Sequence, residues 1–157
     1  LIEERGMSAG ITNTLVGISR LTALPLVFTS GWLSDRLGAK RLIGAVAVCS
    51  GAATVAIGAT GGVLLTVAVL LQPMLIAAFF PAGLIELSKI APAETRNLTL
   101  ALVIPVANLF GAGAVPSVLG HLAEGGHFGL GFVGVGGLML AALALLPLLP
   151  DSPREPQ

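Results

Sequence analysis

Charge is scarce in this chain of 157 residues. Asp, Glu, Lys and Arg make up 10% of it, and the eight acidic residues balance the eight basic ones, so the formal net charge is zero. Soluble domains contain about 25% charged residues, so these few charges could not cover the surface of a soluble protein of this size. The balance of charge also excludes the basic footprint of a nucleic-acid-binding protein, and we expect no nucleic-acid partner.

Cysteine is almost absent, and so are the patterns of common catalytic and metal sites. The single cysteine, Cys49, lies in an apolar segment and cannot form an internal disulfide; we expect a small buried thiol. His121, Glu124 and His127 recur every three residues, but in a glycine-containing stretch that we expect to be a solvated outer loop. Without a glycine-rich phosphate loop, nucleophile elbow or zinc-ligand spacing, the sequence predicts no enzyme, no metal and no cofactor.

The first residues lack the design of a secretory signal peptide. The chain begins Leu1-Ile2-Glu3-Glu4-Arg5, without Met, without a basic region and without an apolar core. We therefore expect the sequence to be a fragment of a longer protein.

Long apolar segments are what the sequence has in abundance. From Leu42 to Ile85, 44 residues carry no Asp, Glu, Lys or Arg. A transmembrane helix needs about 20 mostly apolar residues, so this run predicts two crossings joined by a hairpin at Thr60-Gly61-Gly62. The whole chain predicts an all-α, polytopic transmembrane helix bundle with five spans. The predicted spans are 9–33, 42–59, 63–85, 98–120 and 128–149.

The basic residues predict the orientation of these spans. Six of them fall on one side of the membrane, whereas the other side holds only Arg5. The six are Arg36, Lys40, Arg41, Lys89, Arg96 and Arg154. Lys and Arg accumulate in cytoplasmic loops, so we expect a multi-pass protein of the plasma or inner membrane that begins outside and ends in the cytoplasm.

Residues 31–41, here called the signature segment, have a distinctive pattern. Their sequence is Gly31-Trp32-Leu33-Ser34-Asp35-Arg36-Leu37-Gly38-Ala39-Lys40-Arg41. The spacing of its Gly, Leu, Asp, Arg and Lys residues closely resembles the signature loop of the major facilitator superfamily, and only Ala39 departs from a usually basic position. In that family the pattern lies between helices two and three and again between helices eight and nine.

Four further spans follow the signature segment, so the resemblance implies helices eight to twelve of a transporter whose N-terminal half is missing. It also implies a secondary transporter whose halves rock about a central site, with the segment as a cytoplasmic latch. Alternatively, its charges serve only as topology anchors. From the fold of the family we expect Glu86 to pair with Arg36 or Arg41, and Asp35 to point toward the missing half.

Arg20 is the one charge expected deep in a span. An arginine at a helix centre costs roughly 2.5–3.5 kcal/mol on insertion scales, and no acidic residue occurs at the same depth. Its counter-charge is then a substrate anion or an acid of the missing half, unless Arg20 bonds only to carbonyls and hydroxyls. Asn13, Gln72 and Asn108 are further candidates for the cavity lining, although lone amides also hold helices together.

Prolines and glycines inside the spans predict bent and closely packed helices. Pro25, Pro73, Pro81, Pro105, Pro116 and Pro147 all interrupt predicted spans, and glycines cluster early in the fifth. Small residues let helices approach closely, so close packing is one explanation for the glycines. Bending of the helices during transport is the other.

The function expected from these observations is secondary active transport of a small solute, with Arg20 favouring an organic or inorganic anion. An exporter of neutral or cationic drugs, a non-transporting membrane scaffold on the same fold, and a membrane enzyme or its anchor are the alternatives. The sequence shows no acid/base or metal cluster, which a membrane enzyme would need. A scaffold would not need Arg20.

Overall fold

The computed structural model describes residues 9–149, and these form five helical spans. The first three spans are α2 (Ala9–Leu37), α3 (Ala39–Ala59) and α4 (Gly62–Ile90). The fourth span consists of α5 (Arg96–Asn108), the π-helix η1 (Leu109–Ala114) and α6 (Val115–Glu124). The fifth consists of α7 (Phe128–Ala141) and the 3₁₀-helix η2 (Ala142–Leu148). Each span is long and apolar enough to cross a membrane, and no strand occurs among the described residues. The predicted α-helical transmembrane bundle is confirmed.

The helices extend beyond the apolar runs from which they were predicted. Thus α2 continues to Leu37 and α4 to Ile90, through charged residues that follow the apolar stretch. The signature segment is consequently mostly helical, and its turn is reduced to Gly38. Gly38 has a φ of 85°, a conformation that side chains disfavour, which explains why α2 stops there and α3 starts at once.

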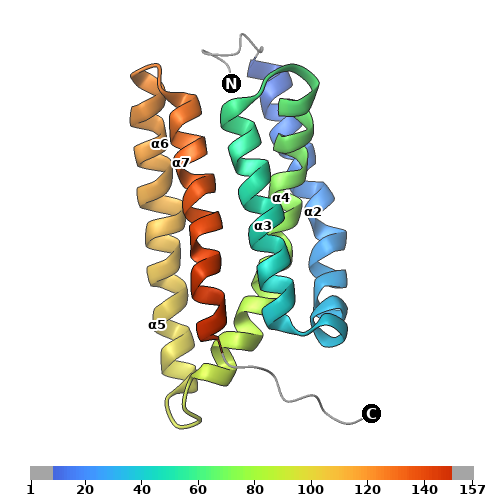
Figure 1. Ribbon diagram of the computed structural model, residues 1–157, viewed down its shortest axis with the longest axis vertical. Helices are drawn as coiled ribbons and strands as arrows, with labels where there is room; N and C mark the ends of the chain where they lie inside the picture. Colours follow the sequence, from blue (N-terminus) through green and yellow to red (C-terminus); the bar gives the residue numbers. More distant parts are fainter. Residues whose placement is uncertain (1–8, 150–157) are drawn as a thin grey trace.

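Figure 1 shows α2, α3 and α4 packed together, α7 beside α3, and the fourth span at the outer edge beside α7. The turn at Gly38, the turn at residues 91–95 and the end of η2 lie at one end of the bundle. The α3–α4 and α6–α7 turns and the start of α2 lie at the other end (Figure 1). The largest contacts are those of α4 with α2 and α3, and of α3 with α7.

Small side chains dominate the packed faces of α2 and α4. Among the residues of α2 whose burial the structure describes, Ser19, Ala23, Ser30 and Ser34 are buried. The hydroxyl groups of Ser19 and Ser30 donate to carbonyl oxygens of their own helix one turn earlier, at 2.8 and 2.7 Å. Because these side chains are short, the backbones of the two helices can approach closely.

Glycines bring α3 and α7 into contact. Gly44, Gly51 and Gly58 recur every seven residues on α3, and Gly129 and Gly136 do so on α7. A Cβ atom added to Gly136 would lie 2.8 Å from the Gly51 carbonyl oxygen and 2.7 Å from a methyl group of Val55. These glycines are therefore required by helix packing.

Other glycines face no neighbouring atom. A Cβ added to Gly134 or Gly137 of α7, or to Gly111, Gly113 or Gly120 of the fourth span, would find nothing within 4 Å. Packing within this chain thus accounts for one group of glycines and not for the other.

The fourth span changes its helical type in the middle. Pro105 lies in α5, Pro116 lies at the start of α6, and η1 separates the two helices. The Ser117 hydroxyl donates to the Gly113 carbonyl at 2.9 Å, close to the position where Pro116 supplies no N–H. Only the α6 part packs extensively on another span, namely α7, and every residue of α5 from Arg96 to Leu98 and from Ala101 to Asn108 is exposed.

Candidate functional site

The signature segment presents its charges on the last turn of α2 and the first turn of α3. The Arg36 guanidinium lies over the Trp32 ring, 4.5 Å from its centroid, in a cation–π contact of about 0.5–1 kcal/mol at an exposed site. Asp35 and Arg41 are exposed, and neither makes an ion pair within residues 9–149. Gly31 and Gly38 have no atom within 4 Å of an added Cβ, so Gly38 is required by its φ and not by lack of space.

Glu86 does not form the pair that we expected. It is 2% exposed and continues the packed face of α4 one turn after Ala82, whereas Arg36 and Arg41 are exposed. Its carboxylate instead accepts a hydrogen bond from Lys89 Nζ at 2.9 Å, within the same helix. Residues three apart on a helix are neighbours, so a local lysine meets the buried acid without any rearrangement between helices.

Lys40 connects the signature segment to the fifth span. Its Nζ donates to the Leu149 carbonyl oxygen at 2.7 Å, across 109 positions of sequence. Leu149 follows η2, whose terminal carbonyls carry partial negative charge, so the lysine stabilises the end of that helix.

Arg20 is exposed on α2 and makes no ion pair or hydrogen bond within the described part of the chain. It lies three residues, ~4.5 Å, from the helix midpoint at Ala23. The packed face of the helix runs through Ser19 and Ala23, and Arg20 is rotated by about 100° from Ser19 and about 60° from Ala23.

The other predicted cavity residues come from three different helices. Asn13 is exposed near the start of α2, Gln72 is half-buried on α4 before Pro73, and Asn108 is the exposed last residue of α5. No hydrogen bond joins these amides to one another or to Arg20 within residues 9–149. Asn108 directly precedes η1, and π-helical turns are frequent at functional sites.

Of the two histidines that we expected in a loop, His127 lies in the turn between α6 and α7, whereas His121 does not. His121 and Glu124 belong to α6, with a loose contact of 3.9 Å between two side chains that are 90% and 82% exposed. In the described part of the chain, no three His, Cys, Asp or Glu side chains are grouped in a way that could hold a metal ion. Cys49 is exposed on α3, so the expectation of a buried thiol is wrong.

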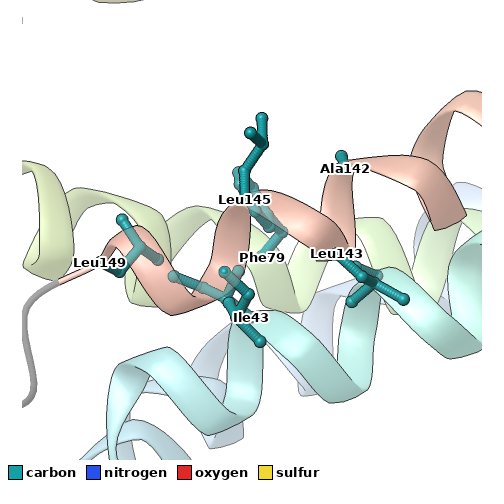
Figure 2. Close-up of a pocket in the computed structure, with 8 residues that line it drawn as sticks. Ile43, Phe79, Ala142, Leu143, Leu145 and Leu149 are labelled. Atoms are coloured by element: carbon teal, nitrogen blue, oxygen red, sulfur yellow. The ribbon is translucent and has the colours of Figure 1, made fainter.

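Sequence reasoning did not identify an apolar pocket at the Lys40 end of the bundle. It has a volume of about 230 Å³ and is lined by α3, α4 and the fifth span. Figure 2 draws its eight lining residues and labels six of them, namely Ile43, Phe79, Ala142, Leu143, Leu145 and Leu149. No periodicity signals such a pocket, because it depends on how three distant segments fit together.

Comparison with known proteins agrees with the motif and the helices. The model of the family described as Major Facilitator Superfamily matches residues 1–157. No match was found among curated proteins or among solved structures. The matching family consists of transporters and not of enzymes, and its members handle small-molecule solutes within a lipid bilayer. The chain therefore belongs to the Major Facilitator Superfamily and is a multi-pass membrane protein that acts in secondary transport of a solute.

Proposed function

We propose that this chain is most of the C-terminal half of an alternating-access transporter, and that the solute it moves is an anion. The observation that carries the proposal is Arg20, an exposed cation close to the midpoint of α2, without a partner in the described residues.

The position of Arg20 requires compensation. A central arginine costs roughly 2.5–3.5 kcal/mol on insertion scales, and such residues usually face a partner or an aqueous cavity. The acids of the described residues are Asp35, Glu86, Glu94 and Glu124, and all lie at helix ends or in turns. A carboxylate-bearing or other oxyanionic solute would supply the missing charge, and the planar guanidinium fork suits two carboxylate oxygens.

Two exposed faces support the assignment to one half of a transporter. Gly10, Gly17 and Gly31 of α2 have no atom within 4 Å of an added Cβ, although small residues typically mark close helix contacts. The residues of α5 are almost all exposed. We propose that the N-terminal half packs on these two faces, and that Asp35 and Arg36 form the latch that opens and closes between the halves.

The distribution of basic residues supports a cytoplasmic position for the Gly38 end of the bundle. Arg36, Lys40, Arg41, Lys89 and Arg96 all lie at this end, and residues 9–149 place no Lys or Arg at the other (Figure 1). By the positive-inside rule, α2 starts outside and the fifth span ends in the cytoplasm of a plasma or inner membrane. Arg5 and Arg154, which were part of the sequence argument, lie outside the described residues.

Uptake by the complete transporter tests the role of Arg20. We expect Arg20→Gln to abolish transport of an anionic substrate, and Arg20→Lys, which keeps the charge without the fork, to retain part of it. Arg96→Gln is the control, because it removes a cation of the same type from the membrane surface. Undiminished transport by Arg20→Gln, or a wild-type substrate that is neutral or cationic, would contradict the anion site and favour a drug-type exporter.

A further inference from the structure

Asn13 and Arg20 lie on the same face of α2. They are seven positions apart, which is almost two full turns, so their directions around the helix differ by only about 20°. Both side chains are exposed, and neither makes a hydrogen bond or an ion pair within the described part of the chain. The face through Ser19 and Ala23 packs on other helices, so the face that Asn13 and Arg20 share is open to a partner of another kind.

The surface of α2 between these two polar groups is low. Gly17 lies there, three positions before Arg20 and four after Asn13, and a Cβ atom added to it would find nothing within 4 Å. Helical side chains lean toward the N-terminus of their helix, so Arg20 extends across this turn toward Asn13. The two Cα atoms are about 10.5 Å apart along the helix axis. A short solute can therefore reach both side chains while it lies against Gly17, under the half of the transporter that packs on this face.

The chemistry of the pair defines the solute more narrowly than Arg20 does alone. A guanidinium group binds one carboxylate through two N–H donors, and the Asn13 amide both donates and accepts, which suits a neutral hydroxyl or carbonyl group. An ammonium group on the solute would find no counter-charge on this helix, since no acidic residue of α2 precedes Asp35. A plain alkyl chain would leave the amide without a hydrogen-bond partner once the face is covered, which costs free energy.

We propose that Asn13 is a specificity-determining residue, and that the solute is a short carboxylate with a neutral hydrogen-bonding group at the far end of its chain. The inference rests on the anion site proposed above for Arg20 and adds a second point of recognition to it. If Asn13 instead bonds only to a helix of the other half, its removal changes the uptake of all carboxylates by the same factor. The ratio between the uptake of two solutes therefore separates the two roles.

Uptake of a matched series of solutes by the complete transporter in proteoliposomes measures that ratio. Butyrate, 2-hydroxybutyrate and 4-hydroxybutyrate, each radiolabelled, have the same carboxylate and the same four-carbon chain. We expect kcat/KM for uptake of 4-hydroxybutyrate to be roughly threefold to tenfold that of butyrate, the gain from one neutral hydrogen bond. The hydroxyl group of 2-hydroxybutyrate lies beside the carboxylate, too far from Asn13, and should give no advantage.

Variants assign the ratio to Asn13. Asn13→Leu should reduce the ratio of 4-hydroxybutyrate to butyrate uptake to about one. Thr14→Val is the matched control, because it removes an exposed polar group about 100° away on the same helix, and it should leave the ratio unchanged. Asn13→Asp should admit 4-aminobutyrate, which the wild type excludes, because the new carboxylate supplies the counter-charge that an ammonium group needs.

Arg20→Gln in the same assay separates this inference from the one on which it rests. Loss of all uptake in that variant, together with a ratio near one in the wild type or a ratio that survives Asn13→Leu, would overturn the role of Asn13 and leave the anion site in place. Butyrate uptake that Arg20→Gln does not diminish would contradict the anion site itself. Uptake of none of the three solutes by the wild type would overturn the proposed class of solute.

Discussion

Two adjacent glycines of α7 show how the same residue type has different roles one position apart. Gly136 is buried against the Gly51 carbonyl and Val55, whereas an added Cβ on Gly137 has open space around it. The difference arises only from the 100° rotation between successive helix positions. Substituting each by alanine adds one methyl group to the same helix, so the pair forms a matched test of the packing between α3 and α7.

We expect Gly136→Ala to destabilise the protein by about 1–3 kcal/mol, the usual cost of forcing an extra carbon into a packed site. Gly137→Ala should change stability by less than about 0.5 kcal/mol, as is usual for substitutions away from packed features. Unfolding in detergent followed by circular dichroism measures both. Equal destabilisation by the two variants would show that contact with α3 does not determine the result, since helix propensity alone favours alanine over glycine at both positions.

For single charged residues, the sequence predicted the place of the residue along its helix better than its ion-pair partner. It placed Arg20 near the middle of a helix without an acid at its depth, because burying charge is costly enough to make each intramembrane charge conspicuous. It gave the wrong partner for Glu86. The prediction used the helices that are neighbours in the family and did not consider Lys89, which is one turn away on the same helix. Local i,i+3 pairs require no knowledge of how helices are rotated about their axes, whereas pairs between helices do.

Among the elements, the fourth span has the least regular backbone. One part of it, α6, is fixed on α7, where Gly131 receives the side chains of Leu119 and Leu122. Its other part, α5, has little contact with other helices, and η1 joins the two. A π-helical turn contains an additional residue, so η1 sets the rotation of α5, and therefore of Asn108, relative to the fixed part.

Deleting Ala112 and Gly113 should convert η1 to α-helix and rotate α5 by about 100° relative to α6, because the first deletion removes only the additional residue of the π-turn and the second removes one α-helical position. We expect the variant to insert and fold, because α6 and α7 keep their contacts, but to lose transport at least about tenfold, since misplacing a functional group by about 1 Å already costs about 10²-fold in enzymes. Uptake and detergent unfolding are measured together. Gly111→Ala, which meets no atom, is the control; unchanged transport after the deletion would show that the orientation of α5 is unimportant.

The five spans were predictable because bilayer thickness requires about 20 apolar residues and charge is excluded from them. Their ends were underestimated, since the helices continue through residues such as Arg36 and Lys89 until Gly38 or the turn before Arg96 stops them. Pro105 and Pro116 predicted an irregular fourth span, but not a π-helix. The type of irregularity depends on which backbone groups find partners, and that is decided by packing.

On the scale of the whole molecule, the two ends of the bundle differ in charge. Each end carries one exposed glutamate. Glu94 lies in the turn between α4 and α5, at the basic end, and Glu124 lies where α6 ends, at the opposite end. This difference makes the proposed orientation accessible to a simple chemical test with residues of equal type and exposure.

We expect an impermeant thiol reagent to label Glu124→Cys in intact cells, and to label Glu94→Cys only after the membrane is permeabilised. Both variants are made in a Cys49→Ala background, because the native thiol is exposed on α3 and would give its own signal. The expectation follows from the positive-inside rule. Labelling of Glu94→Cys alone in intact cells would show that the topology is the reverse of the proposed one.

The contact between α3 and α7 also determines when the protein can finish folding during its synthesis. Thr54 and Met139, which meet across this contact, are separated by 85 positions in the chain. At 5–20 residues per second, the ribosome needs roughly 4–17 s to make the intervening segment. Throughout that interval the glycine face of α3 is in the membrane without its partner, so insertion of the last span is the step that closes the bundle, and a ribosome that stalls before α7 leaves a helix surface able to associate with other nascent chains.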